Sequence, residues 1–277
     1  MTIAALNGAR IAFDDSGAPP TTPAGQPGGI PLVLIHAGIA DRSMWDDQVA
    51  AFAPAHRVVR LDQRGFGESD APPEPFSPGE DVRALLDHLA IDRAVVVGIS
   101  MGGETALDLA LDHPARIAGL VLCSTLAARR EEPGPELVAI WQTSDAAYEA
   151  GDLAGAVEIE TAGWVDGVGR RPGTLDPAAR VRAVAMIRKT WDRAGDQHGE
   201  RLPLDPPRQD RLGEVVCPTL ILRGDLDLPD VTASTDALIA DIPGATFVLI
   251  PDAAHLPPLE QPAAFNAALR AWLATLT

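Results

Sequence analysis

The pattern of apolar and polar positions along this 277-residue chain alternates between two kinds of segment. Short, unbroken apolar runs are typical of strands that are buried on both faces of a sheet, and longer stretches with apolar residues at helical spacing lie between several of them. This alternation predicts an α/β fold with a mostly parallel, eight-stranded sheet and helices on both faces. The predicted strands span residues 3–6, 9–14, 31–35, 57–61, 93–97, 118–122, 219–222 and 246–250.

The most informative segment follows the predicted strand 93–97. Gly98, Ser100 and Gly102 form a Gly-x-Ser-x-Gly pattern, and apolar positions at helical spacing come after it. A serine between two glycines at a strand-to-helix turn is a nucleophile elbow, which presents the hydroxyl above the sheet edge beside a helix N-terminus. Ser100 is therefore the candidate nucleophile.

An activated serine needs a base to remove its proton, and the base needs a third group that fixes its tautomer. Where such elbows occur, the acid and then the histidine follow the serine along the chain. His255 lies in the loop after the predicted strand 246–250, and ligands collect at such loops in open α/β sheets. His113 ends a helical stretch and His198 follows no strand, so His255 is the preferred base.

Three carboxylates follow the predicted strand 219–222 and compete for the role of the acid. Asp227 is the preferred residue and Asp225 is the alternative. Asp230 is well placed to cap the helix that follows it. The strand 118–122 is followed by no carboxylate, so the acid belongs to the later strand.

Four segments in this order make the chain resemble the α/β-hydrolase fold family. They are the sequence LIHAG at residues 34–38, DQRGFGES at 62–69, the elbow, and the acid followed by HLPPLEQP at 255–262. Within the family, residues 80–103 resemble the branch of enol-lactonases, cofactor-free haloperoxidases and small esterases. The resemblance implies a hydrolase with a serine nucleophile and no cofactor.

The resemblance also implies an oxyanion hole, which would be formed by the backbone N–H groups of Met101 and Gly38. Ala37 stands where the family usually has glycine, so the N–H of Ile39 remains an alternative donor. We expect His36 to hold this loop by hydrogen bonds of its side chain. Asp62 and Arg64 either satisfy backbone groups or pair with each other.

The middle of the chain interrupts the alternation of strands and helices. We expect residues 1–126 and 212–277 to form the hydrolase core, and residues 127–211 to form a helical cap over Ser100. This region holds three of the five tryptophans, which either line an apolar substrate pocket or pack between cap helices: Trp141, Trp164 and Trp191. Five of its arginines could hold an acidic substrate, although most of them suit a solvated surface: Arg129, Arg130, Arg170, Arg171 and Arg188.

Composition narrows the class of partner. A net charge of −17 argues against nucleic acid and anionic membranes as partners. The N-terminus has no signal-peptide pattern, and no apolar run approaches the roughly 20 residues that span a bilayer, so we expect a cytoplasmic protein. Cys123 and Cys217 lie in or beside predicted buried strands, and no disulfide is required. No spacing typical of metal ligands stands out, and a homodimer is left open.

These features together predict an enzyme that hydrolyses a small-molecule ester, lactone or thioester. Perhydrolysis and the hydrolysis of carbon–carbon bonds use the same three residues, so both remain alternatives. A biosynthetic lyase or cyclase on the same fold is a further one. A non-enzymatic receptor is the most distant reading, since a fold of this kind can retain its catalytic residues and act by binding alone.

Overall fold

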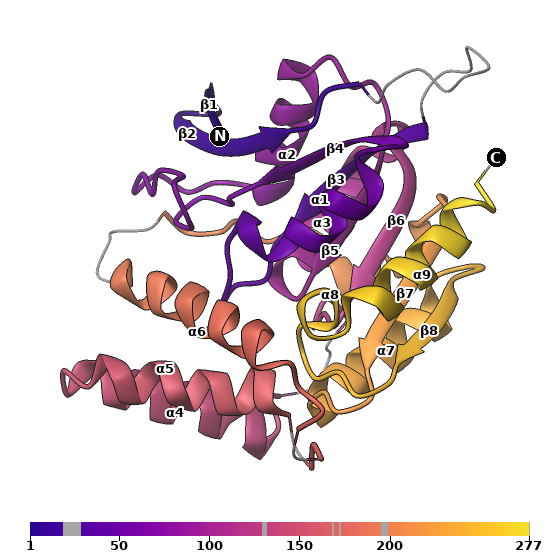
Figure 1. Cartoon of the computed structure of the whole chain (residues 1–277). Coiled ribbons are helices and arrows are strands. Elements are labelled where there is room, and N and C mark those ends of the chain that lie inside the picture. Colours follow the sequence, from indigo (N-terminus) through magenta and orange to yellow (C-terminus); the bar gives the residue numbers. More distant parts are fainter. Residues whose placement is uncertain (19–28, 129–131, 168, 172, 195–198, 277) are drawn as a thin grey trace.

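The computed structural model describes residues 1–18, 29–128, 132–167, 169–171, 173–194 and 199–276. Its strands form one sheet in the order β1-β2-β4-β3-β5-β6-β7-β8 (Figure 1). The β1–β2 and β2–β4 pairs are antiparallel and the other neighbours are parallel, which confirms the predicted fold class. The strands are β1 (Thr2–Leu6), β2 (Ala9–Asp15), β3 (Gly29–Ile35), β4 (His56–Leu61), β5 (Ala94–Ile99), β6 (Ile117–Cys123), β7 (Thr219–Gly224) and β8 (Thr246–Ile250).

Helices cover both faces of this sheet. They are α1 (Asp46–Phe52), α2 (Pro78–His88), α3 (Met101–Asp112), α7 (Pro229–Asp241), α8 (Pro257–Glu260) and α9 (Pro262–Leu273), with 3-10 turns η1 (Arg42–Trp45), η2 (Pro114–Arg116), η4 (Arg208–Asp210) and η5 (Leu212–Glu214). Side chains alternate across a strand, so Val95 and Val97 of β5 pack on the side of α1 and α9, whereas Val96 packs on the side of α2 and α3. Burial on both faces explains why the central strands are unbroken apolar runs.

A group of helices lies between β6 and β7 in the chain and stands apart from the sheet layers (Figure 1). It comprises α4 (Pro135–Glu149), α5 (Leu153–Thr161), the π-helical turn η3 (Ala162–Asp166) and α6 (Pro177–Asp192). Its apolar side chains, among them Leu137, Val157 and Ile187, continue the core cluster on the α1 and α9 side of the sheet. We call these four elements the cap helices.

The chain returns from the cap helices to the core before β7. Gly199 N–H donates to the Pro72 carbonyl at 2.9 Å, and Leu202 N–H donates to the Phe76 carbonyl at 2.8 Å. Further along, Arg208 of η4 pairs with Asp108 of α3 at 2.6 Å. Residues 199–211, placed in the cap region from the sequence, therefore make their polar contacts with the core.

Candidate active site

Ser100 lies at the turn between β5 and α3, where the backbone is strained. Its φ of 52° and ψ of −122° are values that residues with a side chain rarely adopt, and such strain is typical of functional sites. A Cβ on Gly98 would lie 2.1 Å from the Gly102 carbonyl oxygen, and one on Gly102 would lie 2.4 Å from the Ile35 carbonyl oxygen. Glycine is required at both positions because neighbouring backbone fills the space that a side chain would need.

Ser100, His255 and Asp227 form a continuous run of hydrogen bonds. Ser100 Oγ lies 2.8 Å from His255 Nε2, and His255 Nδ1 lies 3.0 Å from Asp227 Oδ1. The side chains of His255 and Asp227 are buried, with 2% and 0% exposure. With the proton on Nδ1, the imidazole donates to the carboxylate and leaves Nε2 free to accept the serine hydroxyl, the arrangement that activates a serine.

The other candidates for the acid and the base lie away from the hydrogen bonds between Ser100, His255 and Asp227. Asp225 is exposed and makes no side-chain contact with His255, so the structure brings Asp227 and not Asp225 to the histidine. Asp230 is not a helix cap, because Leu228 occupies the N-cap position of α7 and Asp230 accepts the Gly134 N–H at 2.7 Å. His113 ends α3 and contacts Glu80, far along the chain from the turn, and His198 lies outside the described residues.

Gly38 and Met101 form the corner that was expected to be the oxyanion hole. A Cβ built on Gly38 would lie 3.6 Å from Met101 Cβ, so the two residues are in contact. Within the described part of the chain, the N–H groups of Met101, Gly38 and Ile39 donate to no protein acceptor. Ala37 has no positive φ, so the backbone at this position accommodates alanine without strain. The geometry leaves both Gly38 and Ile39 available as the second donor.

His36 and residues 62–69 hold this corner in place. His36 is fully buried, its Nδ1 lies 2.7 Å from the Ala37 carbonyl oxygen, and its Nε2 accepts the Gln63 N–H at 2.9 Å. Burial lowers the pKa of His36, which favours the neutral ring that this pair of contacts requires. His36 therefore has the loop-holding role that the sequence suggests.

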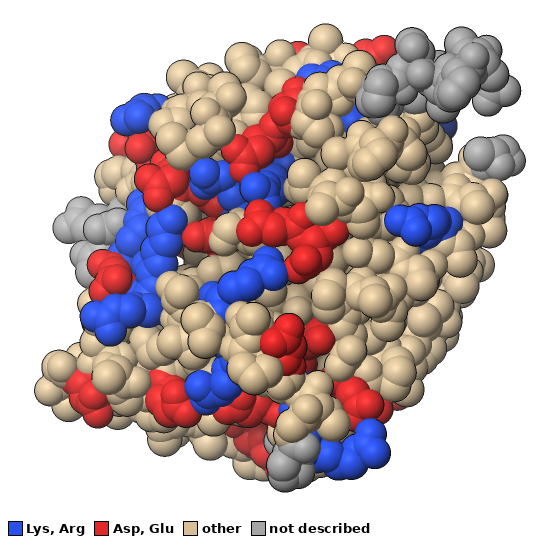
Figure 2. Space-filling model, in the orientation of Figure 1, with Lys and Arg blue, Asp and Glu red and all other residues tan. Residues whose placement is uncertain are grey.

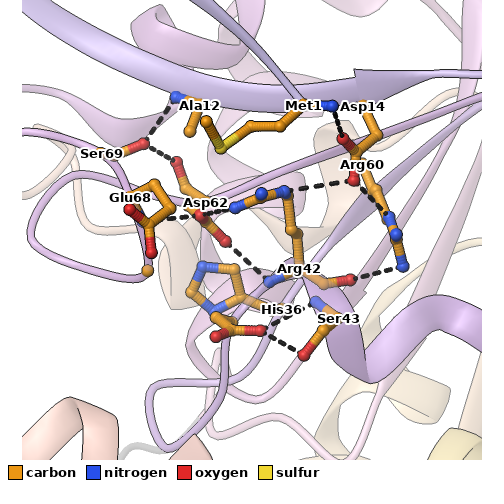
Figure 3. Close-up of polar contacts among 12 residues, drawn as sticks. Met1, Ala12, Asp14, His36, Arg42, Ser43, Arg60, Asp62, Glu68 and Ser69 are labelled. Atoms are coloured by element: carbon orange, nitrogen blue, oxygen red, sulfur yellow. Dashed lines mark hydrogen bonds and ion pairs between the residues drawn. The ribbon is translucent and has the colours of Figure 1, made fainter.

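Asp62 sits at the centre of the polar cluster in Figure 3. It accepts the backbone N–H groups of Arg42 and Glu68, both at 2.8 Å, and pairs with the Arg42 guanidinium. Arg64 instead makes two hydrogen bonds of 2.8 Å with Asp81 of α2. Asp62 and Arg64 thus have different partners and do not pair with each other.

The loop that carries His255 is held by two residues that sequence reasoning did not single out. Glu260 accepts the N–H groups of Ala254 and Leu256, both at 2.7 Å, on either side of the histidine. Arg170 binds the same carboxylate and donates to the carbonyl of Asp252. Glu260 was visible only as one letter of the HLPPLEQP segment, and nothing in the sequence links it to Arg170.

Trp164 of the cap helices packs directly on the histidine. The ring centroids of Trp164 and His255 are 4.4 Å apart, and His255 N–H donates to the Trp164 carbonyl at 3.0 Å. Trp164 belongs to the π-helical turn η3, and such turns are frequent at functional sites. The cap helices therefore contact His255 itself.

A cavity of about 350 Å³ opens beside the Gly38–Met101 corner. Its wall includes Ile39, Phe66 and Phe76 from the core loops, and Ile187, Thr190 and Trp191 from α6. Glu160 of α5 and Arg201 also face it, although neither was singled out from the sequence. Burial raises the pKa of Glu160 to about 7.

The expected substrate-binding tryptophans have three different positions. Trp191 lines the cavity, Trp164 packs on His255, and Trp141 on α4 is 37% exposed and lines no part of this cavity. The three candidate arginines within the described residues do not line it either. Arg170 pairs with Glu260, Arg171 with Asp252, Arg188 is exposed, and Arg129 and Arg130 lie outside the described residues.

Clusters of metal ligands, disulfides and helices that could span a membrane would be further functional features. In the described ranges, no group of three or more His, Cys, Asp and Glu side chains is arranged to hold a metal ion. Cys123 and Cys217 are both buried free thiols. None of the helices within those ranges is long and apolar enough to cross a bilayer.

Comparison with known proteins agrees with the fold described above. Residues 30–262 match the family model described as the alpha/beta hydrolase fold. The chain is 32% identical to 3-oxoadipate enol-lactonase 1 of Acinetobacter baylyi over 231 residues, which cover 81% of each chain. A thermophilic esterase from Thermogutta terrifontis superposes with a TM-score of 0.78 at 29% identity, covering 99% of this chain and 98% of the esterase. The enol-lactonase from Burkholderia xenovorans gives 0.77 at 26% identity, covering 99% and 100%.

These matches confirm the resemblance to the branch that contains enol-lactonases and small esterases. The family model spans the sheet from β3 to β8, the turn that carries Ser100 and the loop that carries His255. The chain belongs to the α/β-hydrolase fold family, and it is a hydrolase.

Proposed function

We propose that this protein cleaves a carboxylic ester, lactone or thioester through an acyl-enzyme on Ser100. The observation that carries the proposal is the run of hydrogen bonds from Ser100 Oγ through His255 to the buried carboxylate of Asp227. The enol-lactonase and esterase relatives support an acyl-transfer reaction on a small-molecule substrate.

The mechanism follows from the positions of these groups. His255 Nε2 takes the proton of Ser100 as its Oγ attacks the carbonyl carbon, and Asp227 stabilises the imidazolium that forms. The N–H groups of Met101 and Gly38 donate to the oxyanion, where one donor is typically worth about 3 kcal/mol of transition-state stabilisation. His255 then protonates the leaving group. Water attacks the acyl-enzyme with the same histidine as its base.

The cap helices supply the second wall of the substrate site in this proposal. Ile187, Thr190 and Trp191 of α6 face the cavity opposite the core loops, and Trp164 packs on His255. In this proposal the core of residues 1–126 and 212–277 carries Ser100, Asp227 and His255, and the cap of residues 127–211 completes the wall of the substrate site. Substrate choice lies with the cap, and Trp191 is the tryptophan placed to take part in it.

The test is the mass of the intact protein after brief exposure to a fluorophosphonate. We expect a single adduct on the wild-type chain, none on Ser100→Ala, and labelling at least about a hundredfold slower on His255→Ala and Asp227→Asn. Asp225→Asn is the matched control and should label at the wild-type rate. Turnover of p-nitrophenyl acetate should follow the same order.

Two results would overturn the proposal. One is an adduct that persists in Ser100→Ala, which would show a different nucleophile. The other is a folded wild-type chain that reacts neither with the fluorophosphonate nor with the smaller phenylmethylsulfonyl fluoride, because a cap that excludes the larger probe would still admit the smaller one. A lyase or a receptor would then be favoured.

A further inference from the structure

Arg201 is a cation of the cavity wall that lacks a carboxylate partner among the described residues. Its Nη2 donates to Thr105 Oγ1 at 3.1 Å, and no Asp or Glu oxygen of the described chain lies within 4.0 Å of its guanidinium. Arg64, the other arginine of the same wall, is fully engaged by Asp81. Burial without a counter-ion is costly, and it lowers the pKa of Arg201.

The nearest acidic groups are already occupied. Arg208 takes both oxygens of Asp108, at 2.6 and 2.8 Å, and contacts Glu104 at 3.4 Å. Thr105 accepts only one of the five N–H groups of Arg201, so the guanidinium keeps donors that face the cavity. A planar fork of this kind suits a carboxylate, which it can bind with two parallel hydrogen bonds.

The backbone holds Arg201 in this position. It forms a β-bridge with Phe76, and the residues on either side of it also bond to Phe76. Phe76 N–H donates to the Glu200 carbonyl at 2.9 Å, and Leu202 N–H donates to the Phe76 carbonyl at 2.8 Å. The cation is therefore preorganised, which reduces the entropy cost of binding a ligand.

Helix α3 connects Arg201 to the Gly38–Met101 corner through the hydroxyl of Thr105. Thr105 lies four residues after Met101 on this helix, and its hydroxyl also contacts the Met101 carbonyl at 3.2 Å. Four residues of α-helix rise about 6 Å. The cavity is thus lined by Met101 of the Gly38–Met101 corner, by Arg201, which bonds to a residue one helical turn further along α3, and by the rings of Phe66, Phe76 and Trp191.

We propose that Arg201 binds a carboxylate at the far end of the substrate's acyl chain, and that the substrate is an ester or lactone of a short dicarboxylic acid. Adipic acid, a diacid of six carbons, is the probe chosen for this class. The inference rests on the proposed function for the identity of the reacting carbonyl. With a net charge of −17 the protein repels anions at long range, so a local cation is needed to hold one.

Glu160 is the carboxyl group of the cavity wall, and it faces the site from the cap. Its pKa of about 7 means that it carries only part of a negative charge at neutral pH. A bound carboxylate at Arg201 therefore meets little repulsion from it.

The experiment compares two esters of the same length that differ by one charge, mono-4-nitrophenyl adipate and methyl 4-nitrophenyl adipate. We expect wild-type kcat/KM to be at least about tenfold higher for the anionic ester. Arg201→Gln should lower kcat/KM for the anionic ester about a hundredfold, mainly through KM, and change the neutral ester less than about threefold. Arg201→Lys should keep part of the preference. Arg10→Gln, at an exposed position on β2, is the matched loss of charge and should leave both values unchanged.

Binding is measured separately from turnover. Ser100→Ala should bind monomethyl adipate more tightly than dimethyl adipate by calorimetry, and adding Arg201→Gln should remove the difference. Equal turnover of the two esters by the wild type, or an equal loss on both in Arg201→Gln, would overturn the inference. If neither ester is turned over but the charge-selective binding is present, the proposed chemistry fails and the anion site stands. If the binding shows no charge selectivity, the anion site fails.

Discussion

The carboxyl groups of Asp227 and Glu160 are both buried and have different partners. Asp227 accepts hydrogen bonds from His255 and from the Leu228 N–H at 2.9 Å. Glu160 accepts a hydrogen bond from the Ser144 hydroxyl at 3.3 Å. The Glu160 side chain also lines the cavity wall. An ionised carboxylate needs donors, so the environment of Glu160 disfavours its charged form and raises its pKa.

Glu160 should make the stability of the protein depend on pH. Its folded-state pKa is about 7 against an ordinary value of 4.5, so the folded chain binds more protons between these values and stability falls as pH rises through this window. Glu160→Gln should remove about 2 kcal/mol of this fall between about pH 5.5 and pH 8. Urea unfolding of both proteins at several pH values measures the difference. Parallel pH profiles for the two proteins would contradict the assignment.

The loop between β8 and α9 shows how one element positions the side chain of His255. Glu260 in α8 accepts the N–H groups on both sides of His255, and Arg170 from the cap region completes the site. A local hydrogen-bond pattern within one loop thus sets the position of the imidazole relative to Ser100.

Replacing this carboxylate should lower the rate more than the affinity. Glu260→Gln leaves one amide oxygen for two N–H donors and places an NH₂ group against Arg170, so we expect kcat to fall about 10- to 100-fold with little change in KM. The pH profile of kcat should also shift, because His255 loses its fixed orientation. A lower melting temperature with unchanged kcat and pH profile would show a structural role alone.

At the scale of the whole molecule, charged side chains join the cap helices to the core. Lys189, the only lysine of the chain, contacts Asp41 at 3.3 Å and Glu68 at 2.9 Å, and Arg182 contacts Asp47 at 2.8 Å. Figure 2 shows positive and negative side chains intermixed along this boundary. Asp41 follows the oxyanion corner by three residues, so these contacts link α6 to the loop that carries Gly38.

These ion pairs should make the cap sensitive to salt. Exposed pairs are worth about 0.2–1 kcal/mol and are screened at high ionic strength. We expect Lys189→Met to speed hydrogen exchange of the α6 amides about two- to fivefold at 0.1 M salt, and 1 M salt to bring the wild type close to the variant. The amides of β5 should exchange as before. Equal changes in α6 and β5 would show global destabilisation instead.

The sequence by itself determined the sheet, the turn and the order of the catalytic candidates. Burial on both faces requires unbroken apolar runs, and a strained turn requires glycine where backbone atoms crowd, so both features appear in consecutive letters. His255 could be chosen because it follows a strand. The sequence could not decide firmly between Asp227 and Asp225 as the partner of His255. Both are aspartates of the same loop, and they differ only in the direction in which the backbone presents their side chains.

Only the tertiary structure decided which cations and carboxylates face the substrate. Arg201 lies at the cavity because a β-bridge holds its backbone against Phe76, which is 125 positions earlier in the chain. Arg170 and Arg171, which were candidates from the sequence, pair with Glu260 and Asp252 instead. Glu160 and the Glu260–Arg170 pair depend on how the cap helices meet the core. Such contacts join residues that are distant in the chain, and the charge of a side chain does not determine which of the oppositely charged residues will be its partner in the folded protein.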